Sequence, residues 1–352
     1  MDGAKYATED LKKFASDCFV AAGVPAKDAD WTADTLVLAD LSGKSTHGIS
    51  RLSAYIGGID KGKINPRPNI SVQITGAATA TVDGDDGLGP VVARAAMQTA
   101  IERAKEAGVG AVTVRRGNHI GVLARYANMA ADEGFIGLVL TNAQPAIPPW
   151  GGRRAYFGTN PIAMSAGRGD EQISVDLATS VTARGNVIMA SKDGSEIPEG
   201  WAIDEAGEPT TDAAAALKGA LLPMAGPKGY SLALLVEILS GVLSGAAIGD
   251  EVGSIYDDAP DAPNTGIFVL VLNPGFFLGE SGAFATRLSQ MEQAIHANPL
   301  AKGVSAVYLP GERQRAEICK REAQGMALPE TTKNELQALA NRFSLNLPKE
   351  FA

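Results

Sequence analysis

The sequence predicts an α/β chain in which a body of strands and helices carries a small helical unit built from both termini. Helical patterns cover residues 8–62 and 332–343, while strands and helices alternate between them. With 352 residues and 45% hydrophobic content, the chain can form two domains. We expect a helical domain of residues 1–70 plus about 300–352 and a mixed-sheet domain of residues 71–299.

The N-terminal helices are predicted from apolar spacing and from their end signals. "EDLKKFASDCFVAAG" places Leu11, Phe14 and Cys18 on one face, and Gly23 ends it. "PAKDADWTADTLVLADLSG" begins with a proline and ends with a glycine, as helices often do. A third helix, "GISRLSAYIGGIDKG", is expected to start near Gly48 with Tyr55 facing inward.

The body begins at about residue 70, where the pattern changes to strands. "SVQITGAATATVDGDDG" alternates like two strands around turns. Helical and strand patterns then follow in turn, namely "PVVARAAMQTAIERAKEAG", "GAVTVRRG", "VLARYANMAADEG", "IGLVLTN", and, after a proline-rich loop at 143–161, the strands "QISVDLATS" and "GIFVLVLNP".

Charge and composition exclude several classes of protein. A net charge of −9 and a pI near 5.0 argue against nucleic-acid binding, which needs a basic surface. The two cysteines lie far apart and the N-terminus has no apolar signal core, so we expect a cytoplasmic protein. The apolar stretch 229–249 contains Glu237, and we therefore predict a buried helix of a soluble protein and no membrane partner.

The stretch "KSTHGISRL" at 44–52 is the first candidate site. His47 lies at or before the start of the predicted third helix, four residues before Arg51. A positive helix end and a guanidinium together suit a carboxylate, and a histidine beside them can exchange a proton with the neighbouring oxygen. A capping histidine and a solvent-exposed arginine would give the same spacing, so the pattern alone does not decide.

The second candidate is His119, in a loop between a predicted strand and a helix, where α/β proteins often bind ligands. His296 is interpreted as a helix-end residue without a role. No histidine pair has metal-ligand spacing, no G-x-S-x-G elbow occurs, and no G-x-G-x-x-G follows a strand. A dinucleotide must then bind elsewhere, for example at "DLATS" (176–180), Lys228 or "LPGERQR" (309–315).

Several motifs, in order from about residue 40 to 315, resemble those of the type-2 malate/L-lactate dehydrogenase family. They are "THGISRL", "GKINP", "GNHIG", "TNAQPAIPPWGG", "FGTNPIA", "DLATSVTARG", "GWAIDEAGEPTTD", "GALLPMAGPKGYSLALLVEILSGVLSG" and "LPGERQ". The resemblance implies a cofactor domain on a mostly antiparallel, non-Rossmann sheet, NAD or NADP as cofactor, a small carboxylate substrate, and a homodimer.

The resemblance also implies roles for individual residues. His47 matches the histidine of proton transfer, Arg51 the carboxylate-binding arginine, His119 a second acid/base, and Thr159 a substrate contact. Thr46 stands where serine is common and is expected to orient His47. The positions that match cofactor contacts are Ile120, Gly121, Val122, Leu123, Ala124, Asn142, Ala143, Asp176, Leu177, Ala178, Lys228, Gly311, Glu312 and Arg313.

The resulting hypothesis is an NAD(P)-dependent oxidoreductase that moves hydride between nicotinamide and C2 of a small 2-oxo or 2-hydroxy acid of the malate, lactate or sulfolactate type. His47, as an imidazolium with a pKa near the working pH, is expected to donate the proton. One alternative is a cyclic-imine reductase for pyrroline- or piperideine-2-carboxylate, against which Asn186 counts, because that branch has an aspartate there. A second alternative is a non-catalytic dinucleotide-binding protein.

Overall fold

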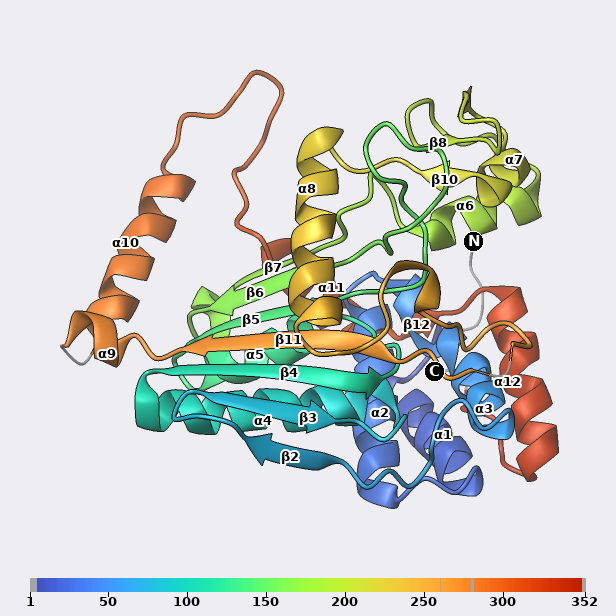
Figure 1. The fold of residues 1–352 in the computed structure, drawn as a ribbon, viewed down its shortest axis with the longest axis horizontal. Coiled ribbons are helices and arrows are strands. Elements are labelled where there is room, and N and C mark those ends of the chain that lie inside the picture. The colour runs from blue at the N-terminus through green and yellow to red at the C-terminus, as the bar shows by residue number, and fades with distance from the viewer. Residues whose placement is uncertain (1–4, 260, 280–281, 350–352) are drawn as a thin grey trace.

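A central seven-stranded sheet organises the molecule, a computed structural model that describes residues 5–259, 261–279 and 282–349. Helices α4 (Gly89–Ala107) and α5 (Ala124–Asp132) cover one face of the sheet, while α8 (Pro227–Val236) lies over the other (Figure 1). The helices from the two termini gather at one side of this layered body (Figure 1). The predicted mixed α/β class is therefore confirmed.

The sheet is mostly antiparallel. Its order is β2-β3-β4-β11-β5-β6-β7, and within it β3 and β4 run parallel while the other neighbouring pairs run antiparallel. The predicted strands all form, and the structure adds β6, which the sequence analysis did not identify. Their bounds are β2 Ser71–Ile74, β3 Thr79–Asp83, β4 Val109–Gly117, β5 Ile136–Thr141, β6 Ile162–Ala166, β7 Ile173–Leu177 and β11 Thr265–Leu272.

Small residues let α4 pack closely on the middle of the sheet. Ala96 and Ala100 of the helix share a fully buried core with Val112 of β4 and Val269 of β11. A Cβ atom on Gly110 would lie 1.9 Å from the carbonyl oxygen of Ala100, so that position accepts only glycine. On the opposite face, Val236 of α8 packs against the sheet with Leu140 and Phe268.

The terminal helices share one hydrophobic core. α1 (Thr8–Ala21), α2 (Ala26–Leu41), α3 (Leu52–Asp60) and α12 (Glu330–Phe343) bury Leu11, Phe14, Leu36, Leu336 and Leu339 together, among others. The short strand β1 (Lys5–Tyr6) pairs antiparallel with β12 (Met326–Ala327) and joins the two ends of the chain. The domain boundaries stay a prediction, and residues 1–4 and 350–352 of the predicted helical domain lie outside the described residues.

A third cluster, which the sequence analysis did not anticipate, is centred on residues 184–221, and its small core also includes Ala146, Ile147, Phe157 and Ala233. It combines α6 (Arg184–Asp193) and α7 (Ala213–Lys218) with a three-stranded sheet of β8, β9 and β10. These strands are Ala202–Ile203, Pro209–Thr210 and Ala220–Leu221.

The segment 229–249 is helical as far as Val242, and it is only partly buried: Ala233, Val236 and Ser240 are buried as predicted, but other side chains are exposed. α8 continues into a π-helical turn at Glu237–Val242, and one flank stays open, with Ile238, Val242 and Leu243 each about half exposed. Nearby, α9 (Gly275–Leu278) and α10 (Ala283–His296) bury no residue, and α10 stands away from the body (Figure 1). None of the helices described is long and apolar enough to span a membrane.

Candidate active site

The connection that carries His47 is two short 3-10 turns, Ser45–His47 and Ile49–Arg51, and α3 begins only at Leu52. The buried carboxylate of Asp40 accepts a 2.6 Å hydrogen bond from the Ile49 backbone N–H. A Cβ atom on Gly48 would lie 2.2 Å from that carboxylate, so glycine is required there. The expected anion site at this helix start differs in one respect. The backbone N–H of Ile49 already donates to the Asp40 carboxylate, so it is not free to bind an anion.

Charged neighbours surround His47. Its Nδ1 lies 3.0 Å from Thr46 Oγ1, and Lys44 forms a 2.7 Å ion pair with Asp176 beside it. Burial, followed by the positive charge of Arg51, lowers the pKa of His47 to about 4. Arg51 is itself held in place, because its Nε donates a 2.5 Å hydrogen bond to the Thr46 carbonyl.

His119 follows β4 and faces His47 across the site. The two rings are stacked, with centroids 5.5 Å apart and planes inclined by 23°. The hydroxyl of Tyr55 lies 2.6 Å from His119 Nδ1, and it donates to the His119 carbonyl at 3.1 Å. Burial, with smaller contributions from His47 and Arg51, holds the pKa of His119 well below its usual range.

Both imidazoles are consequently neutral near pH 7 in the ligand-free protein. The lowered pKa of His47 differs from the value near the working pH that a proton donor favours. The physical reason is that desolvation of the half-buried ring and the neighbouring guanidinium both disfavour its charged form. The sequence placed Arg51 next to His47 but did not reveal the desolvation of the ring.

Two cavities lie along the loop after β4. A cavity of about 100 Å³ contains both histidines, and a second of about 80 Å³ lies beside Asp176 and Gly311. Gly121 and Leu123 line the first cavity, whereas Val122 and Ala124 line the second. The first is lined by His47, Asn118, His119, Ile120, Gly121, Leu123, Thr141, Asn142, Ala143, Gln144, Thr159, Pro161, Gly253, Ile255, Pro263 and Thr265.

The predicted site residues divide into those that line a cavity and those that do not. Twelve line one of the two: His47, His119, Thr159, Ile120, Gly121, Leu123, Asn142 and Ala143 in the first, and Val122, Ala124, Asp176 and Gly311 in the second. The others lie nearby or on the surface: Thr46, Arg51, Leu177, Ala178, Lys228, Glu312 and Arg313.

Some of these outlying residues have other partners. Glu312 binds His296 at 2.8 Å and accepts a hydrogen bond from the Leu309 backbone N–H. The guanidinium of Arg313 lies over the Tyr308 ring, 4.4 Å from its centroid. These contacts order the segment around Gly311, the one residue of 311–313 that lines the second cavity.

Sequence reasoning missed three groups that support the site. Tyr55 was expected to face inward, but nothing in the sequence indicated its hydrogen bond to His119. The buried carboxylate of Glu237 receives hydrogen bonds from Asn142, Asn160 and the Gly249 backbone N–H. A single carboxylate inside an apolar helix was the signal for this role of Glu237, since such a group needs donors.

The third missed group is Asp40, whose pKa burial raises to about 6, against the opposing effect of the Ile49 N–H. No group of three or more potential metal ligands occurs among the residues that the structure describes. Two stacked, neutral imidazoles line one cavity of this mixed α/β chain, and an arginine lies nearby. Such an arrangement can carry acid/base chemistry on an anionic ligand.

Comparison with known proteins identifies the family. A model described as malate/L-lactate dehydrogenase matches residues 6–337, and the chain belongs to that family. L-Sulfolactate dehydrogenase of Methanocaldococcus jannaschii is 39% identical over 96% of this chain and 97% of its own length. A solved sulfolactate dehydrogenase from the same organism has a TM-score of 0.90 and covers 97% of this chain and 98% of its own.

Two other relatives are named for substrates other than sulfolactate. The ureidoglycolate dehydrogenase (NAD(+)) of Escherichia coli K12 is 38% identical and covers 92% of each chain. The solved Δ1-piperideine-2-carboxylate reductase of Pseudomonas syringae pv. tomato has a TM-score of 0.86 at 31% identity, covering 96% of this chain and all of its own. The predicted family and the predicted oxidoreductase are confirmed, and relatives are named for NAD(+) as well as NADP(+).

Proposed function

We propose that this protein reduces a small 2-oxo acid with NADH or NADPH, or oxidises the corresponding 2-hydroxy acid. The observation that carries the proposal is the stacked pair His47 and His119 in a cavity next to Arg51. Hydride arriving at C2 leaves negative charge on the substrate oxygen, and a proton must neutralise it. The two imidazoles are in place to supply that proton.

The cofactor is proposed to lie along the loop at Ile120–Ala124, which lines both cavities. Its dinucleotide part is proposed to lie by Gly311 and Asp176, with Leu177, Ala178, Lys228, Glu312 and Arg313 around it, and its reactive ring by Asn142 and Ala143. Asp176 is prepared for this role, because Lys44 and the Ala124 N–H fix its carboxylate. When bound, the cofactor supplies the hydride.

Arg51 is proposed to hold the substrate carboxylate with its planar guanidinium. The carboxylate then offsets the positive charge that lowers the pKa of His47 in the free protein. Substrate binding therefore raises the pKa of His47 and lets it carry the proton that it donates. Thr46, at 3.0 Å, orients His47, while Thr159 and His119 contact the substrate from the sheet side.

A spectrophotometric screen tests the proposal. It crosses both cofactors with lactate, malate, sulfolactate, ureidoglycolate, their oxo forms, and pyrroline- and piperideine-2-carboxylate, and it follows the absorbance of the reduced cofactor. We expect turnover with at least one pair. Binding of the reduced cofactor without oxidation by any of these acids would instead support a non-catalytic protein.

A cyclic-imine reductase is the second candidate, because the solved piperideine-2-carboxylate reductase shares this fold. Asn186 argues against this candidate, because its side-chain amide donates to Thr182 Oγ1 at 3.0 Å. Gly185, the residue before Asn186, packs on Thr46: a Cβ atom added to Gly185 would lie 2.9 Å from Thr46 Cγ2. We therefore expect the two cyclic imines to react more slowly than the best 2-oxo acid in the same screen.

We further propose a cytoplasmic homodimer with a helical domain and a cofactor domain at the boundaries predicted above, on a non-Rossmann sheet. The dimer is supported by exposed apolar residues that a monomer leaves in water. They lie on α8 and its π-helical turn, on α9, and on α10: Leu234, Leu235, Ile238, Val242, Leu243, Phe276, Phe277 and Met291. Sedimentation of the purified protein tests this.

A further inference from the structure

Two buried polar atoms at the cavity have no hydrogen-bond partner among the described residues. Seven buried side-chain atoms are in this state, and only those of Asn118 and Thr265 belong to residues that line the cavity of the two histidines. Asn118 is 1% exposed and Thr265 is 6% exposed. An unpaired buried polar group is costly, so a ligand partner is the natural explanation at a binding cavity.

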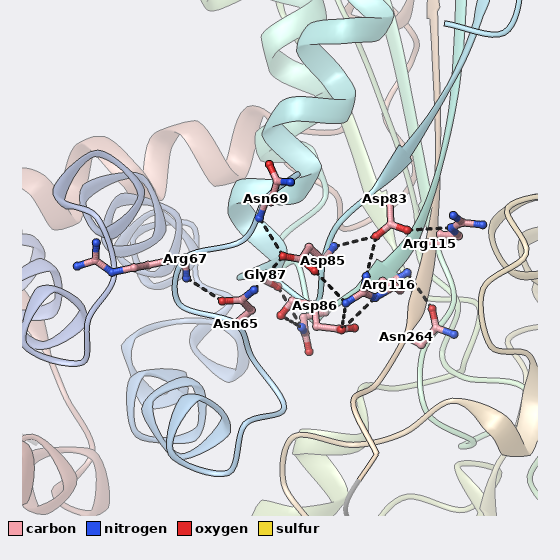
Figure 2. A network of polar contacts seen from close by, with 11 residues as sticks. Asn65, Arg67, Asn69, Asp83, Asp85, Asp86, Gly87, Arg115, Arg116 and Asn264 are labelled. Carbon is pink, nitrogen blue, oxygen red and sulfur yellow. Dashed lines mark hydrogen bonds and ion pairs between the residues drawn. The ribbon is translucent and has the colours of Figure 1, made fainter. Parts of the chain in front are cut away.

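The orientation of the Asn118 amide is fixed by its surroundings. Its Nδ2 donates to the carbonyls of Asp86 and Gly87, at 2.9 and 3.0 Å. Figure 2 shows how that turn is held: Arg116 binds Asp86 at 2.6 Å and Asp85 at 3.0 Å. Both protons of the Asn118 amide are thus used, and Oδ1 remains as a pure acceptor.

Thr265 supplies the complementary group on the next strand. It pairs with Gly117, the residue before Asn118, across β4 and β11. Its Oγ1 lies 3.3 Å from the position of a Cβ on Gly117, so the hydroxyl sits beside the strand that leads to Asn118. Next to it, Asn264 accepts a 2.8 Å hydrogen bond from the Arg116 N–H, which joins the two strand ends where their register shifts (Figure 2).

An acceptor and a hydroxyl that belong to residues lining the same cavity match a primary carboxamide, which presents an N–H donor and a carbonyl acceptor. We propose that Asn118 Oδ1 and Thr265 Oγ1 bind the carboxamide of the nicotinamide ring. This inference rests on the proposed function. Because the ring can then bind in one orientation only, the pair determines which ring face meets the substrate beside the histidines.

The test compares NADH with reduced 3-acetylpyridine adenine dinucleotide, in which a methyl group replaces the carboxamide NH2. Dissociation constants are measured by cofactor fluorescence. The wild type is expected to bind NADH about tenfold more tightly, as for one buried hydrogen bond. Asn118→Ala removes the acceptor, and its preference for NADH is expected to fall to about twofold or less.

Thr265→Val should act on both ligands alike, since both keep the carbonyl that Thr265 Oγ1 is proposed to bind. It is expected to weaken both by a similar factor, and Thr265→Ser is expected to restore binding. Thr141→Val is the matched control, because that hydroxyl also lines the cavity but already donates to the Gly266 carbonyl at 2.8 Å. Thr141→Val is expected to keep the full preference for NADH.

The outcomes separate this inference from the proposed function. A folded Asn118→Ala protein that keeps the tenfold preference overturns the carboxamide assignment, and the reductase proposal stands. If Asn118→Ala cannot be folded, an unchanged affinity of Thr265→Val for both ligands overturns the assignment equally. A wild type that binds neither dinucleotide contradicts both proposals.

Discussion

His47 lies in the short connection between α2 and α3, whereas His119 follows the central strand β4, and different forces hold the two segments. The His47 segment is fixed by one buried carboxylate, Asp40, which binds the Ile49 N–H at 2.6 Å. The His119 segment is fixed by a network of four charged side chains (Figure 2) and also by Tyr55.

The neighbours of the two rings differ in the same way. Arg51, Lys44 and Asp176 act on His47 through their charges, and an anionic ligand can alter that balance. His119 instead bonds a neutral phenol, and burial keeps that Tyr55 hydroxyl from ionising by raising its pKa. The difference indicates that His47 responds to substrate charge, whereas His119 keeps a fixed orientation.

Removal of either ring is expected to have the largest effect. His47→Ala and His119→Ala should each lower turnover by about a hundredfold or more, because general acid catalysis contributes that much. Cofactor fluorescence should show that both variants still bind NAD(P)H. His296→Ala is the comparison: His296 lies outside the cavity of the two histidines and pairs with Glu312 beside Gly311, so any loss should appear in cofactor affinity and not in the acid/base step. Full activity in both cavity variants would remove the site from consideration.

Arg51→Lys is expected to come next. It keeps the positive charge but loses the planar fork that pairs with a carboxylate, so the substrate KM should rise about tenfold. Arg342→Lys changes a comparable fork, which binds Asp60 at 2.6 and 2.7 Å outside the site, and should leave KM unchanged. An unaltered KM in Arg51→Lys would place the carboxylate elsewhere.

The stability of the protein should reveal opposite effects of Asp40 and His47. The native pKa of His47, about 4, lies below its ordinary value of 6.5, so the unfolded chain binds this proton first. The stability of the folded protein therefore falls as the pH falls from 6.5 to 4. The native pKa of Asp40 is about 6 and lies above 3.8, so folding gains stability as the pH falls through the same range.

Asp40→Asn removes this gain. Between pH 6 and pH 4, the free energy of unfolding of the variant should therefore fall by about 2 kcal/mol more than that of the wild type. Urea unfolding at the two pH values measures this difference. Parallel profiles for wild type and variant would show that Asp40 is not protonated in the native state at pH 4.

The smallest expected effect concerns the network behind His119. Arg116→Met removes the ion pairs to Asp83, Asp85 and Asp86. Both residues must adopt the same positive φ of 52° at this position, so the backbone requirement does not change. The loss should cost about 1 kcal/mol of stability, because the guanidinium is partly exposed. Turnover should fall a few-fold. Arg115→Met, which loses one exposed contact to Asp83, should behave like the wild type in both measurements. Equal effects of the two variants would mean that the network does not position the loop.

Much of the fold could be predicted because its signals are local. Alternation gave the strands around Val112 and Val269, and apolar spacing gave the helices around Leu11 and Leu336. Strand β6 was missed because it follows a proline-rich loop without an alternating pattern. The exposed flank of α8 was missed because apolar composition does not tell a monomer core from a surface that a partner can cover.

The candidate site was predicted less completely. The resemblance placed His47 and His119, which the structure brings together from positions 72 residues apart. It did not indicate Tyr55, Asp40 or Asn118, because their roles depend on contacts between distant segments. The lowered pKa of His47 follows from burial, which no spacing of residues reveals.

The most direct test is a titration of the histidine rings by NMR, which is practicable because the chain has only three. His47→Asn and His296→Asn assign the signals. In the free protein His47 should titrate near pH 4, and with NADH and oxamate, an unreactive 2-oxo acid analogue, its pKa should rise by about one pH unit or more. A His47 pKa that stays the same with the analogue bound would contradict the claim that the substrate carboxylate turns this imidazole into the proton donor.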